Sequence, residues 1–174
     1  MNFRKGNSED LEQLKALGVK SWSQFKNQLT DQHWSDLYKT INNKDTYANL
    51  LKISDCVICE NNDQKIIGMA FLVPKGNPTE IYDATWCHLR FVSVDPEYRG
   101  QKIGETLTGK CIEIALQNNE QMMALHTAEL MYSARHIYEK IGFKVFKAIE
   151  PKFGLKYWLY TLELDKANRT IKNN

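Results

Sequence analysis

The chain has 174 residues, 43% of them hydrophobic and 25% charged, which suits one globular domain with a core of its own. Its 23 basic and 21 acidic residues are interspersed and leave a net charge of +2, which argues against a nucleic-acid-binding surface. No apolar run approaches membrane-spanning length and the polar start lacks the core of a signal peptide, so we expect a cytoplasmic protein without membrane contact.

The N-terminal part of the chain predicts one strand and two helices. Residues 1–5 form the strand, and Ser8 begins a helix whose leucines recur at helical spacing until Gly18 ends it. The second helix opens at Thr30 or Asp31 and carries its own apolar face.

A strand hairpin follows. Residues 56–60 and 66–73 are rich in strand formers, and the polar residues 61–64 between them predict a hairpin turn. Cys56 and Cys59 are three apart in the first strand, so their side chains point to opposite faces and cannot share a metal ion. We expect all four cysteines to be buried free thiols.

Residues 86–94 read as a long strand that leads through a glycine-bearing turn into an amphipathic helix. The first turn of a helix has backbone N–H groups without internal partners and a partial positive charge, so it favours an anion. Gly100 and Gly104 let the backbone approach a bulky ligand, while Arg99 and Lys102 add cationic side chains. This layout predicts a phosphate-binding site.

Another strand and a short helix come next. Residues 122–126 predict the strand. The helix has Ser133 as N-cap, Tyr138 on its apolar face and Gly142 as its left-handed C-terminal residue, and Phe143 opens a further strand.

The chain ends in an apolar strand and a polar tail. Residues 157–164 are apolar on both faces, which predicts a strand in the interior of a sheet and is compatible with a homodimer. With no repeat or linker, we expect one domain over residues 1–165 and a polar tail over residues 166–174 that frays.

Two short patterns stand out by their order and separation. Residues 99–104 fit the pattern Arg or Gln, two residues, Gly, one residue, then Gly or Ala, except that Lys102 takes the place of the first Gly. Residues 134–143 fit Ala, three residues, Tyr, three residues, Gly-Phe. With their flanking strands, over roughly residues 55–165, they resemble the two signatures of the GNAT superfamily of N-acetyltransferases.

The resemblance implies a fold and an activity. The fold is a single GNAT-like α/β domain with a mixed, mostly antiparallel central sheet flanked by helices, in the order β-α-α-β-β-β-α-β-α-β-β. The activity is transfer of an acetyl group from acetyl-CoA, without a metal, to a primary amine of a small molecule or a protein. Lys102, and Met131 in place of a usual Asn, keep open a catalytically silent CoA-binding or regulatory module. A dinucleotide-binding oxidoreductase is the third reading, but the loop is not Gly-x-Gly-x-x-Gly.

The resemblance also implies the residues that bind the donor. In the family, backbone amides of the loop wrap the pyrophosphate, and the end of the preceding strand pairs with the pantetheine amides. A lysine at position 102 suits such a loop if its φ is negative. The implied donor-binding residues are Val92, Val94, Arg99, Gly100, Gln101, Lys102, Ile103, Gly104 and Ser133.

Tyr138 and His88 are the candidate catalytic residues. The family often uses a tyrosine at the position of Tyr138 to protonate the leaving thiolate; the alternative is a core aromatic. His88 lies where some members have a glutamate base and could deprotonate the amine near neutral pH; the alternative is a half-buried histidine bonded to the backbone. Glu80 and Asp83 are competing bases or anchors for a cationic acceptor.

The acceptor pocket is expected between the strand of residues 86–94, the two N-terminal helices and the loop of residues 74–82. If alternation along the strand is regular, His88 shares a face with Arg90, Val92 and Val94. The aromatic residues available to line the pocket, or equally to pack in the core, are Trp22, Phe25, Trp34 and Tyr38.

Overall fold

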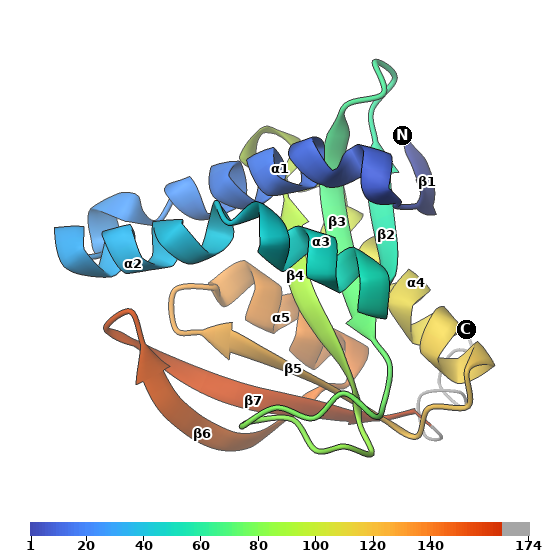
Figure 1. Cartoon of the computed structure of the whole chain (residues 1–174). Coiled ribbons are helices and arrows are strands. Elements are labelled where there is room, and N and C mark those ends of the chain that lie inside the picture. The colour runs from blue at the N-terminus through green and yellow to red at the C-terminus, as the bar shows by residue number, and fades with distance from the viewer. Residues whose placement is uncertain (165–174) are drawn as a thin grey trace.

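A computed structural model describes residues 1–164, and the predicted tail of residues 166–174 lies outside this range. The strands are β1 (Asn2–Lys5), β2 (Asp55–Glu60), β3 (Ile66–Val73), β4 (Cys87–Val94), β5 (Met122–Ala128), β6 (Lys144–Lys152) and β7 (Leu155–Glu163). The α-helices are α1 (Leu11–Ser23), α2 (Asp31–Ile41), α3 (Lys44–Ile53), α4 (Ile103–Gln117) and α5 (Tyr132–Ile141) (Figure 1). The predicted order is confirmed except for α3, which the sequence prediction missed.

Two local predictions in the N-terminal helices were wrong. Helix α3 follows α2 after only two residues, and it begins with a polar turn whose N-cap, Asn43, accepts a hydrogen bond from the Asp45 N–H. Gly18 does not end α1, which continues to Ser23. A Cβ at Gly18 would overlap the hydroxyl of Tyr47 on α3, so this glycine permits close helix packing instead.

The sheet has the order β1-β2-β3-β4-β5-β7-β6, and its neighbours are antiparallel except for β4 and β5. The sheet is therefore mixed and mostly antiparallel, as predicted, and β7 lies in its interior between β5 and β6. The parallel pair is short: it joins Cys87 to Met123 and His88 to Ala124. Beyond these residues the two strands separate, as Figure 1 shows near the centre of the molecule.

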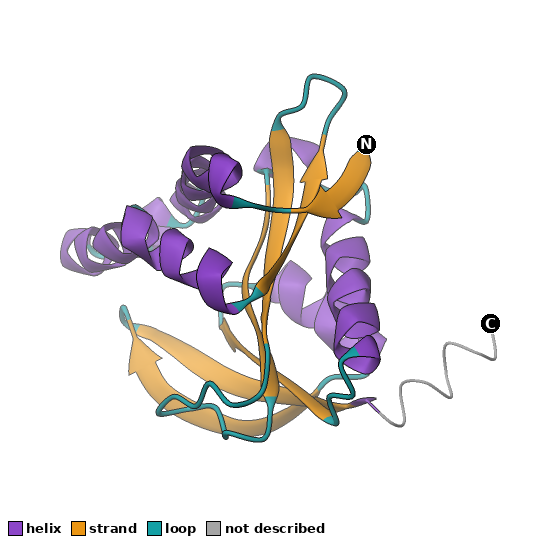
Figure 2. Cartoon of the chain, turned by 45° about the vertical axis from the view of Figure 1, so that its right-hand side comes forward, coloured by secondary structure: helices purple, strands orange, loops and turns teal. Residues whose placement is uncertain are grey.

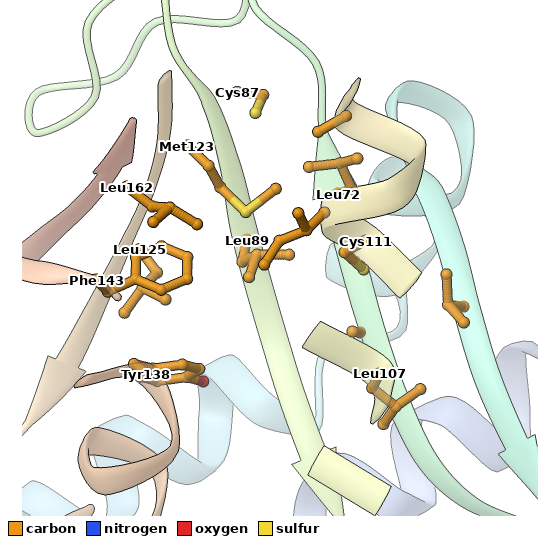
Figure 3. Packing of buried hydrophobic residues seen from close by; sticks show 14 of the residues in the cluster. Leu72, Cys87, Leu89, Leu107, Cys111, Met123, Leu125, Tyr138, Phe143 and Leu162 are labelled. Atoms are coloured by element: carbon orange, nitrogen blue, oxygen red, sulfur yellow. The ribbon is translucent and has the colours of Figure 1, made fainter. Parts of the chain in front are cut away.

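Helices cover both faces of the sheet (Figure 2). One core lies between the sheet and the helices α4 and α5, and part of it is drawn in Figure 3. A second core lies between the sheet and the helices α1 and α3. Cys59 belongs to the first core and Cys56 to the second, so the two thiols point to opposite faces as predicted. All four cysteines are buried and free.

Strand β4 contains a bulge that overturns the predicted regular alternation. Its register against β3 shifts between the pairs Met69–Ser93 and Phe71–Arg90, and Phe91 has a φ of 49°. Leu89 and, beyond the bulge, Val92 both pack on the first core, whereas Phe91 packs on the second. His88 and Arg90 therefore do not share a face with Val92 and Val94, because one extra residue reverses the alternation.

Within residues 1–164, no helix combines the length and the apolar character needed to cross a bilayer. The cytoplasmic location remains a prediction.

Candidate active site

A cavity of about 390 Å³ opens where β4 and β5 separate. Residues 89–93 of β4 and 125–127 of β5 form two of its walls, and residues from α1, α2 and α5 form others. The loop residues 79–82 and the hairpin between β6 and β7 complete its lining. The expected pocket between β4, the N-terminal helices and the loop is therefore present, with further walls from the C-terminal half.

Beyond His88, strand β4 pairs with β3 but has no partner strand among residues 1–164 on its β5 side. Backbone N–H and C=O groups of such an edge can pair with the amides of an extended ligand. Val92, predicted to lie along such a ligand, lines the cavity. Val94 does not; it packs on the first core at the start of the turn.

The turn after β4 has the features of an anion site. Arg99, Gly100, Gln101 and Lys102 are exposed, and α4 begins at Ile103. Lys102 is the N-cap, and its side chain makes no capping hydrogen bond to the first turn. The first N–H groups of α4 have no acceptors within the helix, and the Lys102 ammonium group cannot accept their hydrogen bonds, so this turn suits a bound phosphate.

Lys102 contradicts the expectation of a negative φ. Its φ is 58° and its ψ is 14°, the left-handed conformation that glycine adopts without cost. The turn therefore keeps the backbone geometry of a glycine while carrying a lysine at that position. Gly100, with a φ of 75°, is the second left-handed residue of the turn.

Asp95 fixes the base of this turn. Its carboxylate is buried, accepts a hydrogen bond from the Glu97 N–H, and lies 2.9 Å from Nζ of Lys20 on α1 and 3.5 Å from Nζ of Lys65. Burial alone would raise the pKa of Asp95, but the bonds from Lys20 and Glu97 outweigh it and lower the pKa. The charged carboxylate thus ties the turn to α1.

Helix α5 presents Tyr138 to the cavity. Met131, Ala134 and Tyr138 lie on one helical face and line the cavity. The Tyr138 side chain is buried and packs edge-on against Phe143, with ring centroids 5.8 Å apart. Burial raises the pKa of Tyr138, so its hydroxyl is protonated at neutral pH. Figure 3 shows its ring between α5 and β4, with the oxygen turned toward β4.

The predicted caps of α5 were half right. The helix ends at Gly142, which has a φ of 114° as predicted. Its N-cap is Met131 rather than Ser133, because the helix already includes Tyr132. Ser133 is exposed and lies outside the cavity lining.

The start of α4 lies beside the second half of α5. A Cβ at Gly104 would lie 3.6 Å from Cδ1 of Ile137 and 3.7 Å from Cγ2 of Val94. Lys140 of α5 also pairs with Glu105 of α4 at 2.8 Å. The turn and the helix that carries Tyr138 therefore lie together at one end of β4.

His88 lies outside the cavity lining. Its side chain is buried and stacks on Tyr82, with ring centroids 4.0 Å apart, and its Nδ1 has no hydrogen-bond partner among residues 1–164. Burial, followed by the charge of Arg90, lowers the pKa of His88 to about 4. A base with this pKa would place an acidic limb near pH 4, not near neutrality as expected.

Sequence analysis missed the pair of Tyr82 and His126, which does line the cavity. The Tyr82 hydroxyl lies 2.6 Å from Nδ1 of His126, and burial, with the charges of Arg90 and Lys152, lowers the pKa of His126 to about 3. The two residues come from a loop and a strand that share no motif. The one signal in the sequence was that His126 ends the predicted strand of residues 122–126, the next strand after the turn of residues 99–104.

The two candidate carboxylates are in different places. Glu80 is exposed and lines the cavity. Asp83 does not line it and accepts hydrogen bonds from the N–H and the hydroxyl of Thr85, which lower its pKa. Asp83 thus stabilises its own turn.

Only one of the four predicted aromatic residues reaches the cavity. Trp22 lines it and packs edge-on against Phe25 at 5.9 Å, while Trp34 and Tyr38 pack on each other at 5.8 Å away from the lining. Helix α2 instead contributes residues of its other face, among them Leu37.

Comparisons with known proteins place this geometry in context. Residues 20–143 match the model of the acetyltransferase (GNAT) family. The human protein N-acetyltransferase 8B is 25% identical over 74% of this chain and 52% of its own length. N-acetylaspartate synthetase from Xenopus tropicalis is 32% identical over 44% of this chain and 33% of its own length. The chain thus spans about half or less of the length of these relatives.

The fold matches solved structures over almost its whole length. PaiA N-acetyltransferase from Thermoplasma acidophilum, solved in complex with coenzyme A, superposes with a TM-score of 0.75 at 20% identity. The match covers 93% of this chain and 98% of the other.

Proposed function

This chain belongs to the acetyltransferase (GNAT) family, and from that membership we propose that it moves an acetyl group from acetyl-CoA to a primary amine of a small molecule or a protein. One observation carries the proposal. The cavity between β4 and β5 brings together an unpaired strand edge, the face of α5 that carries Tyr138 and several charged side chains in one pocket that opens to solvent. These are the parts that an acyl transfer from a long amide-bearing thioester requires.

Residues at the carboxyl end of β4 and in the turn that follows it would hold the donor. The turn of residues 99–104 offers backbone N–H groups and exposed cationic side chains to phosphates. The free edge of β4 around Val92 offers N–H and C=O groups to the pantetheine amides. Acetyl-CoA, when bound, supplies a thioester carbonyl and a thiolate leaving group, and no metal ion is needed.

The reaction needs two proton transfers. The acceptor nitrogen forms a C–N bond to the acetyl carbon while the C–S bond breaks, so the nitrogen must lose a proton and the sulfur gains one. Tyr138 holds a proton on a buried hydroxyl and would donate it to the sulfur. Glu80 is the carboxylate that lines the cavity and would receive the ammonium group and its proton. His88 remains a predicted base, less favoured by its place behind Tyr82.

Replacement of Tyr138 by phenylalanine tests the proposal. General acids contribute about 10²- to 10⁴-fold, so Tyr138→Phe should lower kcat by that order and leave acetyl-CoA affinity unchanged. Released thiol measures turnover with an amine panel, and calorimetry measures affinity. Tyr132→Phe is the matched control, because Tyr132 lies on the same helix but is 70% exposed.

Two other outcomes would contradict parts of the proposal. Unchanged kcat with a lower melting temperature would make Tyr138 a core residue only. Binding of acetyl-CoA without turnover of any amine would favour the catalytically silent module.

A further inference from the structure

The charged side chains that line the cavity are mostly cationic. They are Arg90 of β4, Lys152 at the end of β6, and Glu80 of the loop. Neither Arg90 nor Lys152 forms an ion pair with a carboxylate among residues 1–164. Two cations without a carboxylate partner beside an open pocket are available to a ligand, so this wall is suited to an anionic group.

The bulge in β4 holds Arg90 in place. Arg90 directly precedes Phe91, whose positive φ turns its ring onto the second core beside Tyr47 and Phe71. The guanidinium carbon of Arg90 lies 5.7 Å from the centroid of the Phe91 ring, within the range of a cation–π contact. A half-buried arginine fixed in this way is pre-organised to bind a planar carboxylate with two hydrogen bonds.

Lys152 is brought to the same cavity by the hairpin between β6 and β7. A Cβ at Gly154, in the hairpin turn, would overlap the ring of His33 on α2, so the turn is seated directly against that helix. Figure 1 shows the end of this hairpin below α2. Arg90, Lys152 and His126 line the same cavity, and after burial the charges of the two cations are the next causes that lower the pKa of His126.

Resting on the proposed acetyl transfer, we propose that the acceptor is a small amine that carries a carboxylate near its amino group, as a free amino acid does. Arg90 and Lys152 bind the carboxylate, and Glu80 receives the ammonium group. The cavity of about 390 Å³ can hold a small acceptor beside the thioester. Diamines and polyamines lack the carboxylate and bring a second positive charge toward Arg90, so they are disfavoured.

Matched acceptor pairs test this assignment. The free L-amino acids are compared with their carboxamides, which keep the amine and side chain but lose the negative charge, and with spermidine. Thiol release from acetyl-CoA gives kcat/KM for each. We expect the best free amino acid to exceed its carboxamide by about 10- to 100-fold, the size of a lost charged hydrogen bond.

Arg90→Gln should remove most of the preference for the free amino acid over its carboxamide. The variant should raise KM for the free amino acid and leave kcat/KM for the carboxamide nearly unchanged. Lys147→Gln is the matched control: Lys147 is an exposed lysine of β6 outside the cavity lining, and its loss should change neither acceptor. Thermal unfolding of each variant verifies that the fold is retained.

Failure of the inference and failure of the proposed function give different results. Equal or better use of carboxamides or spermidine would overturn the acceptor assignment while acetyl transfer stands. If no acceptor releases thiol, the proposed function fails, and calorimetry on the CoA-loaded protein decides the acceptor class instead. Free amino acids that then bind no more tightly than their carboxamides, or do not bind, would overturn the assignment.

Discussion

Lys102 occupies a backbone conformation that should cost the protein stability. It is exposed and has a φ of 58°, and its ammonium group cannot offset the conformation by accepting a hydrogen bond from the first turn of α4. Replacing it by glycine should relieve the cost, but it also removes a charge beside the first turn of α4. Lys102→Ala removes the same charge and keeps a Cβ, so comparing Lys102→Gly with Lys102→Ala isolates the backbone effect.

The expected difference follows from two opposing effects. The left-handed conformation costs an L-residue about 1–2 kcal/mol, which glycine does not incur. Glycine gives back about 0.4–1 kcal/mol, because its unfolded chain is more flexible than that of alanine. Taking the midpoints of the two effects, the free energy of unfolding of Lys102→Gly should therefore exceed that of Lys102→Ala by about 0.8 kcal/mol. For a chain of this size that corresponds to a melting temperature about 1–4 °C higher.

Urea and thermal unfolding followed by circular dichroism measure this difference directly. CoA affinity, measured by calorimetry on the same two variants, reports whether the turn itself is affected: we expect Lys102→Gly to bind at least as tightly as Lys102→Ala. Equal melting temperatures, or a higher one for Lys102→Ala, would refute the reasoning, since residue 102 would then not be left-handed in the folded protein.

Two further predictions concern packing and pH. Gly18→Ala should lower the free energy of unfolding by about 1–3 kcal/mol, because its methyl group meets the Tyr47 hydroxyl. Gly109→Ala, where a Cβ has nothing within 4 Å, should raise it by about 0.5–1 kcal/mol in the same denaturation assay; equal effects would contradict the packing argument. Burial lowers the pKa of His88 in the folded protein to about 4, whereas the unfolded chain has the ordinary value of about 6.5. As the pH falls from about 6.5 to about 4, the unfolded chain therefore binds a proton that the folded protein does not, and the free energy of unfolding decreases. Between pH 7 and pH 4.5, the free energy of unfolding measured by urea titration should fall by about 2–3 kcal/mol less in His88→Gln than in the unmodified chain. An identical pH dependence of the two proteins would show that burial does not lower the pKa of His88.

Features set by local chemistry could be predicted from the sequence. The strand of residues 66–73 is a continuous apolar run with the same bounds in the structure. Gly142 ends α5 because only a residue tolerant of positive φ can occupy that position. The turn before α4 was found because its glycines and charges follow one another along the chain.

Features set by contacts between distant segments could not. The bulge at Phe91 depends on how β4 meets β3, and nothing in the strand's own residues announces a left-handed phenylalanine. Its consequence was an incorrect face for Val92 and Val94. The contact of Tyr82 with His126 spans 44 residues and two elements, so neither residue stands out alone.

The two residue pairs that join β4 to β5 also bear on how the molecule unfolds. They are the parallel link between one part of the sheet, β1 to β4, and the other, β5 to β7. Elsewhere the two parts are joined by side-chain packing and by side-chain hydrogen bonds such as that between Tyr82 and His126, rather than by a ladder of backbone bonds. A ligand that pairs with the free edge of β4 would add bonds along this line, so it would increase the cooperativity of the domain as well as occupy a site. A substitution that strengthens binding of such a ligand would then also make it harder for the two parts of the sheet to separate.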